Sequence, residues 1–277
     1  MKLKQRSKKA AAWGLTAAMC ISSLFTSGQT AVIKAEETDA EESVVTLSNP
    51  VIEAEKGHVV WDCIYFGNYW QKKYIPQPGN VPEEGEDDVV HTDDDGTKYI
   101  VRADKNCYKY EPIKWRVLSV NEDGTDAFVM ADKTLDAKTF YSDTDTRNTA
   151  TWENSDVREW LNETFMEAAF SEEEQEAIAT TEIDNLRNPY YDGDIETSGE
   201  DGEPTQDRIY LASLDDMLKE EYGFINNYVP DESKFRETQA RDFEATDFTK
   251  SCRDEEGNSY ADNYLLRTLG AFEHYVL

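Results

Sequence analysis

The hydrophobic pattern after residue 57 first predicts β-strands. Residues 59–67 (VVWDCIYFG) are rich in β-branched and aromatic side chains, as is typical of a strand. From Ile113 to Val117 every second residue is apolar and the residues between are basic, which predicts a strand over residues 113–120. Asp-Gly at 123–124 is a hairpin turn signal, so residues 126–131 should return antiparallel. The first half therefore predicts an antiparallel β-meander.

The middle of the chain changes to a helical period. One helical face carries four apolar residues, at i, i+3, i+4 and i+8: Val157, Trp160, Leu161 and Phe165. Asn154 or Ser155 can cap this helix, and capping boxes predict two more helices beginning at Ser171 and Ser213. The remaining predicted elements are short strands at 98–102 and 208–212 and a helix at 231–246. Strands first, helices next and long polar loops at 76–96 and 184–207 indicate one α+β domain over residues 58–277.

The N-terminus has the pattern of an export signal. Five basic residues within residues 1–9 precede an apolar run, residues 10–25, and the small residue Ala35 stands before the first acid. This order predicts a secretory signal peptide over residues 1–35, cleaved after Ala35. The run is short and rich in Ser and Thr for a membrane span, although an uncleaved anchor stays open as the alternative. We expect a secreted or cell-surface protein with an acidic linker at 36–57 and no membrane span once the signal is removed.

The charge of the chain narrows the function classes. The sequence has 58 Asp and Glu against 28 Lys and Arg, a formal net charge of −30. Because nucleic-acid binding depends on Lys and Arg at the phosphates, this balance argues against a nucleic-acid partner. The three histidines, His58, His91 and His274, are scattered, which argues against a two-histidine mechanism. No Gly-rich phosphate loop follows a predicted strand.

Cysteine chemistry leaves two alternatives. Cys20 is lost with the predicted signal, and Cys63, Cys107 and Cys252 remain. In an oxidising compartment these allow one disulfide, and we favour Cys63 with Cys107 because each lies in or beside a predicted strand of the same half. Three reduced, buried thiols are the other alternative. No CxxC motif is present, so a zinc ribbon or thioredoxin-type site is not predicted.

No motif predicts a cofactor or a catalytic residue. The Asp93–Asp95 run and Asp143 with Asp145 could supply oxygen ligands to calcium, but after Asp143 and Asp145 Arg147 stands where an EF-hand needs an oxygen ligand. A calcium site of another type stays open without a motif to support it. Glycosidases use two carboxylates at a fixed separation, yet among 58 acids a pair at any spacing arises by chance.

Six segments, in order along the chain, resemble one family: 61–71 (WDCIYFGNYWQ), 111–118 (EPIKWRVL), 151–162 (TWENSDVREWLN), 169–174 (AFSEEE), 207–213 (DRIYLAS) and 264–270 (YLLRTLG). They resemble the uncharacterised bacterial extracellular family called domain of unknown function 6273, common in gut Firmicutes. The resemblance implies export, the company of adhesion-type modules and no established activity. The family pattern is similar to the C-type-lectin-like scaffold shared with formylglycine-generating enzymes.

This chain also departs from the family. Family members usually read Trp-Leu-Arg-Ser-Pro-Gly where residues 265–270 are Leu-Leu-Arg-Thr-Leu-Gly. They usually continue for a few more strands, so the resemblance implies that the chain is truncated at Leu277.

Two motifs supply candidate ligand-binding residues, namely Trp152, Arg158, Tyr264 and Arg267. Further aromatics near predicted loops or strand ends suit a sugar-binding platform: Tyr65, Tyr69, Trp70, Tyr74, Tyr190, Tyr191 and Tyr228. In the alternative reading Trp160 and Leu161 are core residues and Arg158 pairs with one of the many acids. We therefore predict a non-catalytic recognition module for a glycan or a protein ligand. A divergent extracellular enzyme, either a hydrolase or a formylglycine-generating-enzyme-like protein, and a structural spacer are the alternatives.

Overall fold

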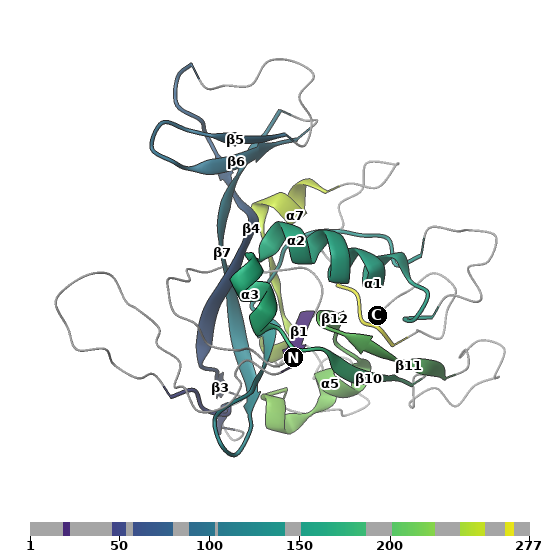
Figure 1. Ribbon diagram of the computed structural model, residues 1–277. Helices are drawn as coiled ribbons and strands as arrows, with labels where there is room; N and C mark the ends of the chain where they lie inside the picture. The colour runs from purple at the N-terminus through teal and green to yellow at the C-terminus, as the bar shows by residue number, and fades with distance from the viewer. Residues whose placement is uncertain are drawn as a thin grey trace.

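The computed structural model describes residues 19–22, 46–53, 58–79, 89–102, 105–141, 151–186, 201–224, 239–252 and 264–268. Within them the fold is α+β, as predicted, with a seven-stranded antiparallel sheet and several short helices (Figure 1). The sheet has the order β12-β1-β8-β7-β6-β5, and β4 pairs with the other edge of β7. Its strands are β1 (Met19–Ser22), β4 (Cys63–Tyr74), β5 (Val90–Thr92), β6 (Lys98–Val101), β7 (Cys107–Val120), β8 (Ala127–Ala131) and β12 (Tyr210–Leu211).

Strand β7 is the centre of the sheet. Strands β5 to β8 follow one another as antiparallel neighbours, so the predicted meander is confirmed. The predicted turn between β7 and β8 is closed by the Asn121 side chain, whose Oδ1 accepts a hydrogen bond from the Asp126 backbone N–H at 2.8 Å. β4 and β7 are longer than the sequence indicated, and the far ends of this pair carry β5 and β6 beyond the helices (Figure 1).

Strand β4 bends where Gly67 takes a left-handed backbone. Gly67 has φ +69° and lies between Tyr65 and Asn68, where the β4–β7 register shifts by one residue. A Cβ added at Gly67 would lie 2.5 Å from the ring of Phe170, so the glycine lets the helices approach the strand. The Glu174 carboxylate accepts a hydrogen bond from the Gly67 N–H at 3.1 Å.

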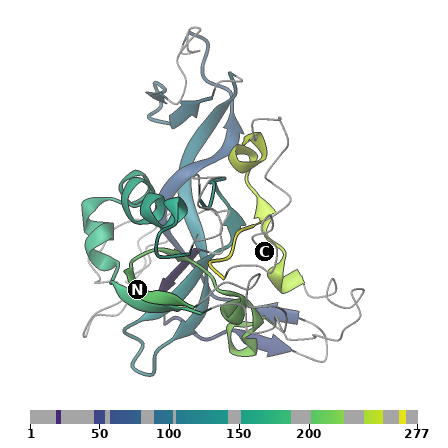
Figure 2. The ribbon, with the colours of Figure 1, turned by 90° about the vertical axis from the view of Figure 1, so that its right-hand side faces the viewer.

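One helical layer covers this sheet, and its caps are those the sequence predicts. It comprises α1 (Asp156–Trp160), the π-helix η3 (Leu161–Phe165), α2 (Met166–Ala169) and α3 (Glu172–Ala177). Ser155 caps α1, and the capping box at Ser171 is formed. In Figure 2 these helices lie on one side of the β4–β7 pair and α7 (Asp247–Ser251) lies on the other.

The helix predicted over residues 231–246 is wrong for its described part. Residues 239–246 form a 3-10 turn, η5 (Gln239–Arg241), and then β13 (Glu244–Ala245). β13 pairs in parallel with β9 (Lys133–Thr134), a partner more than a hundred residues away, and this pairing overrides the local helical pattern. Thr246 then caps α7.

Two small antiparallel sheets complete the described fold. One joins β10 (Thr181–Asn185) to β11 (Gly202–Asp207), and the other joins β2 (Val51–Glu53) to β3 (His58–Val60). Helix α5 (Leu214–Leu218) begins at the predicted capping box of Ser213, and the 3-10 turn η4 (Glu220–Tyr222) follows it. Among the described residues, no helix is both long and apolar enough to cross a membrane.

The predicted Cys63–Cys107 disulfide is wrong. Neither cysteine forms a disulfide in the structure, and Cys252 forms none either. Cys63 lies at the start of β4, whereas Cys107 faces Tyr74 at its end. Eleven residues of extended chain separate these positions, roughly 30 Å or more, and a disulfide needs Cα atoms within about 7 Å. Placing both cysteines on strands of one half was correct, but the register puts them at opposite ends.

Candidate ligand-binding pocket

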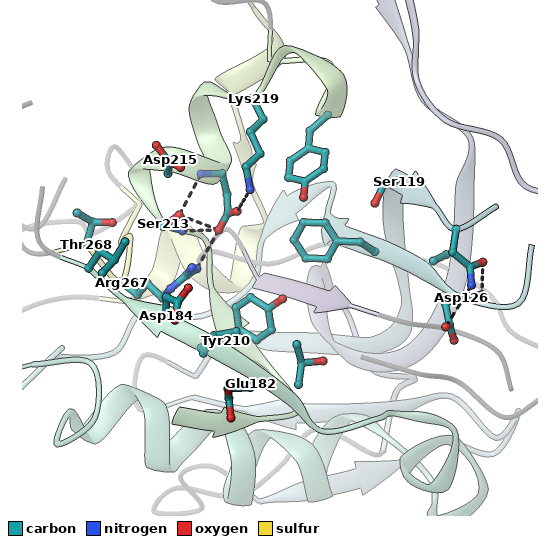
Figure 3. A pocket seen from close by; sticks show the side chains of 18 of the residues that line it. Ser119, Asp126, Glu182, Asp184, Tyr210, Ser213, Asp215, Lys219, Arg267 and Thr268 are labelled. Atoms are coloured by element: carbon teal, nitrogen blue, oxygen red, sulfur yellow. Dashed lines mark hydrogen bonds and ion pairs between the residues drawn. The ribbon is translucent and has the colours of Figure 1, made fainter. Parts of the chain in front are cut away.

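An open pocket of about 670 Å³ lies at one end of the sheet. Four parts of the chain line it, namely the β7–β8 hairpin, β10, the segment from β12 to η4, and the described C-terminal residues 267–268 (Figure 3). Segments far apart in the sequence therefore meet here, and no short motif encodes the pocket.

Asp216 is the charged centre of one wall. Its carboxylate accepts hydrogen bonds from the Ser213 hydroxyl at 2.8 Å and from the Arg267 guanidinium at 2.9 Å, and Lys219 Nζ lies 3.1 Å away (Figure 3). Burial opposes ionisation of Asp216, but the Arg267 charge and the hydrogen bonds of the capping box outweigh it and lower its pKa. This wall is therefore fixed by its own ion pairs.

Three aromatic rings stand beside this cluster. Phe128 packs edge-on against Tyr222, with centroids 5.2 Å apart, and stacks near Tyr210 at 6.4 Å. Lys219 Nζ lies 4.9 Å from the Tyr222 ring centre, and the Arg267 guanidinium lies 5.4 Å from that of Tyr210. The rings and cations thus form one apolar wall with charged edges, in which Phe128 and Tyr210 are buried and Tyr222 is half-buried.

The rim of the pocket is acidic and hydroxyl-rich. Asp215, Glu182 and Asp184 are exposed along it, and Glu182 and Asp184 reach it from β10 (Figure 3). The lining holds five carboxylates against the two cations Lys219 and Arg267. Hydroxyl and amide groups complete it: Ser119, Asn121, Thr181, Ser213 and Thr268. Such a lining suits a neutral or cationic ligand rather than an anion.

Ser213 and Asp216 do not form a nucleophile and general-base pair. Ser213 is hydrogen-bonded to Asp216, but a general base must bind a proton, and Arg267 and Lys219 hold this carboxylate ionised. Among the residues that the structure describes, no group of three or more His, Cys, Asp or Glu side chains could hold a metal. Asp143 and Asp145, which resemble the start of a calcium loop, lie outside the described residues.

Trp152 and Arg158 come together at Asp207, and none of the three lines the pocket. Trp152 is 1% exposed and donates its indole N–H to Asp207 Oδ2 at 2.9 Å, while Arg158 Nε donates to Oδ1 at 2.7 Å. The Thr205 hydroxyl donates to the same carboxylate at 2.7 Å. These side chains join the helical layer to β11. Their geometry is that of a buried structural network rather than of a ligand surface.

The two C-terminal candidates, Tyr264 and Arg267, lie in different surroundings. Arg267 lines the pocket, whereas Tyr264 packs against Phe243 with ring centroids 5.2 Å apart, and burial raises the pKa of the Tyr264 hydroxyl.

The aromatics proposed for a sugar-binding platform include core residues. Tyr69 is buried and its hydroxyl donates to Asp136 at 2.6 Å, and Trp70 packs on Tyr110. Tyr190, Tyr191 and Tyr228 lie outside the described residues.

Sequence reasoning missed most of the pocket. The Ser213–Asp216 capping box was recognised only as a helix start, although the same carboxylate binds Arg267 and Lys219. Phe128 and Tyr222 were not singled out because their contact joins segments almost a hundred residues apart. A short predicted helix with two acids, followed by Lys219, was the local sequence signal that could have pointed to this charged wall of the pocket.

Comparisons with known proteins give one match. A family model described as "Domain of unknown function (DUF6273)" matches residues 126–276. No curated protein and no solved structure matches the chain.

Proposed function

Because the chain belongs to the DUF6273 family, whose function is unknown, we propose a function from the pocket itself: a secreted or cell-surface, non-catalytic module that binds a neutral glycan. The observation that carries the proposal is the pairing of an aromatic wall, of which Tyr222 is the most exposed ring, with a rim of carboxylate, hydroxyl and amide groups. Aromatic rings pack against the apolar faces of sugars, and carboxylates and amides accept or donate to sugar hydroxyls. The cations of the wall are already paired with Asp216, so they leave little positive charge for an acidic sugar.

The carboxylate surplus of the rim favours a second candidate ligand, a basic protein segment. Five acids around the pocket and a chain charge of −30 would attract Lys or Arg side chains of a partner. The salt dependence of binding distinguishes the two ligands. The affinity for a neutral glycan changes little as the ionic strength rises, whereas the affinity for a basic peptide falls.

The decisive experiment is an array of neutral, uronic-acid-containing and sialylated oligosaccharides, with a panel of Lys-rich peptides alongside. We expect neutral oligosaccharides to be retained, and Asp215→Asn to reduce their binding by about tenfold, which corresponds to one lost charge-assisted hydrogen bond. Asp94→Asn removes the same charge from the exposed turn between β5 and β6, which does not line the pocket, and should leave binding unchanged.

Three results would contradict the proposal. If only the Lys-rich peptides are retained, the ligand is a basic protein segment and not a glycan. Hydrolysis or oxidation of a bound oligosaccharide would favour an enzyme. Binding of nothing would favour a spacer. Export is tested separately, by the N-terminal mass of the protein recovered from the medium, which we expect to begin at Glu36.

A further inference from the structure

Strand β1 lies between two other strands of the sheet, and it belongs to the segment predicted to be a signal peptide (Figure 1). Residues 20–22 pair with residues 128–130 of β8, and residues 19–20 pair with residues 210–211 of β12. Both pairings are antiparallel. Cleavage after Ala35 would therefore remove a strand that has a partner on each edge and leave a slot between β8 and β12.

The two walls of this slot are held by contacts that do not involve β1. β8 pairs with β7 along its whole length. Directly before β12, the Asn162 side chain donates to the Ile209 carbonyl at 2.9 Å, and the Arg267 guanidinium donates to the Leu211 carbonyl at 2.9 Å. The walls thus keep their places when β1 leaves.

The slot is too wide for its walls to pair with one another. Neighbouring strands lie about 4.8 Å apart, so two strands with a third between them are about 10 Å apart. Direct pairing would need β12 to move by about 5 Å, which the hydrogen bonds of Asn162 and Arg267 oppose. An empty slot would leave backbone N–H and C=O groups of both walls without strand partners.

The described residues after the predicted signal do not fill the slot. None of their strands lies between β8 and β12. The Arg267 N–H donates to the Ala212 carbonyl at 2.9 Å, and the Leu214 N–H then donates to the Thr268 hydroxyl oxygen at 2.9 Å. The described C-terminal residues therefore run along the start of α5 and lead away from β12.

The walls define the chemistry of a strand that fits between them. Every residue of β8 is buried, as are both residues of β12, and none of them is charged. A charged side chain inserted here would lose its water without gaining a partner. Strands that are buried on both faces are typically continuous runs of apolar residues. The sequence of β1, Met-Cys-Ile-Ser, is itself an uncharged run of four residues.

We propose that export opens this slot and that the slot then binds an extended, uncharged, apolar segment of a separate polypeptide, antiparallel to β8 and β12. In such strand addition the backbone hydrogen bonds supply affinity and the side-chain surroundings supply selectivity. Phe128 and Tyr210 border both the slot and the pocket, so the added strand completes the sheet beside the aromatic wall. The inference rests on the export and cleavage in the proposed function and does not depend on the glycan.

A peptide of residues 17–24 (AAMCISSL) is the probe, and the protein is recovered from the medium, unfolded in urea and refolded alone. Without the peptide, hydrogen exchange measured by mass spectrometry should be fast at the β8 and β12 amides that point into the slot. With the peptide at about one hundred times its Kd, exchange there should slow by about a hundredfold. A peptide with Ile21→Pro lacks a strand N–H and should slow exchange by less than about tenfold at the same concentration.

A disulfide trap tests the register of the added strand. Cys20 of the peptide should form a disulfide with Met130→Cys in the protein, because paired residues of antiparallel strands have Cα atoms about 4.5–5.5 Å apart. Val129→Cys places its thiol on the other face of β8, so it should form no more disulfide with the peptide than the wild type forms.

Four results would overturn the inference. One is slow exchange at β8 in the protein refolded without peptide, since the chain would then close the slot by itself. A second is no slowing by the unmodified peptide, and a third is equal slowing by the Ile21→Pro peptide or equal trapping by both cysteine variants. The fourth is a recovered protein that keeps residues 19–22, which its mass shows without any measurement of glycan binding.

The remaining outcomes also decide the question. If the recovered protein refolds only when the peptide is present, the fold needs an added strand and the inference is supported. The exchange comparison uses the unmodified protein, so it stands even if a cysteine variant fails to fold.

Discussion

Replacing Asp207 with alanine should destabilise the protein strongly. Asp207 is 1% exposed and accepts from Trp152, Arg158 and Thr205, so the substitution removes three hydrogen bonds at once. The Trp152 N–H would be left buried without an acceptor, at about 1–3 kcal/mol. Breaking a buried ion pair costs about 3–5 kcal/mol, and the Arg158 side chain, 27% exposed, recovers part of this from water. We expect a loss of about 3–5 kcal/mol in total.

Urea unfolding followed by tryptophan fluorescence measures this loss. With a urea m-value of about 2–3 kcal/mol/M, the midpoint should fall by about 1–2 M. Asp207→Asn keeps an acceptor for Trp152 and should lose less, and the exposed-turn variant Asp94→Ala should stay within about 0.5 kcal/mol of the wild type. A midpoint for Asp207→Ala that matched Asp94→Ala would refute the reasoning and restore Trp152 and Arg158 as candidates for ligand contact.

Three further outcomes are expected. Gly67→Ala should cost about 2–4 kcal/mol in urea unfolding because it combines a positive φ with a clash against Phe170, whereas Gly124→Ala has a positive φ but open space and should cost only about 1–2 kcal/mol; equal losses would remove the clash from the explanation. The fold lowers the pKa of Asp216 below its value of 3.8 in the unfolded chain. The free energy that ionised Asp216 contributes to folding is therefore complete above pH 3.8, and it is lost as the pH falls through the lower pKa of the folded state. The stability difference between the wild type and Asp216→Asn should therefore shrink below pH 3.8, and a constant difference would contradict the assignment. Cys63, Cys107 and Cys252 form no disulfide, so a reductant should leave the melting temperature unchanged, and a drop in the melting temperature would point to a disulfide.

Local signals in the sequence predicted local structure well. Ser155, Ser171 and Ser213 each cap a helix, because a capping residue and its partner lie within three positions of one another. The β7–β8 hairpin followed from alternation and an Asp-Gly turn for the same reason.

Features that depend on distant pairing were beyond such signals. Whether Cys63 could reach Cys107 depended on the register of β4 against β7 over a dozen residues. Helical periodicity near residue 244 could not reveal that β9 would supply a strand partner. The pocket is the extreme case, since Phe128, Tyr222 and Arg267 meet only after four parts of the chain have folded together.

The long strand β7 has a consequence for how this family is divided into parts. The family match begins at residue 126, after β7 has ended, yet β8 pairs along β7. Trp115 of β7 is fully buried among residues of the matched segment, such as Phe170. A protein expressed from residue 126 onward would thus expose the inner edge of β8 and lose a central core side chain. Swaps between family members should keep residues 58–125 together with the sequence that follows them.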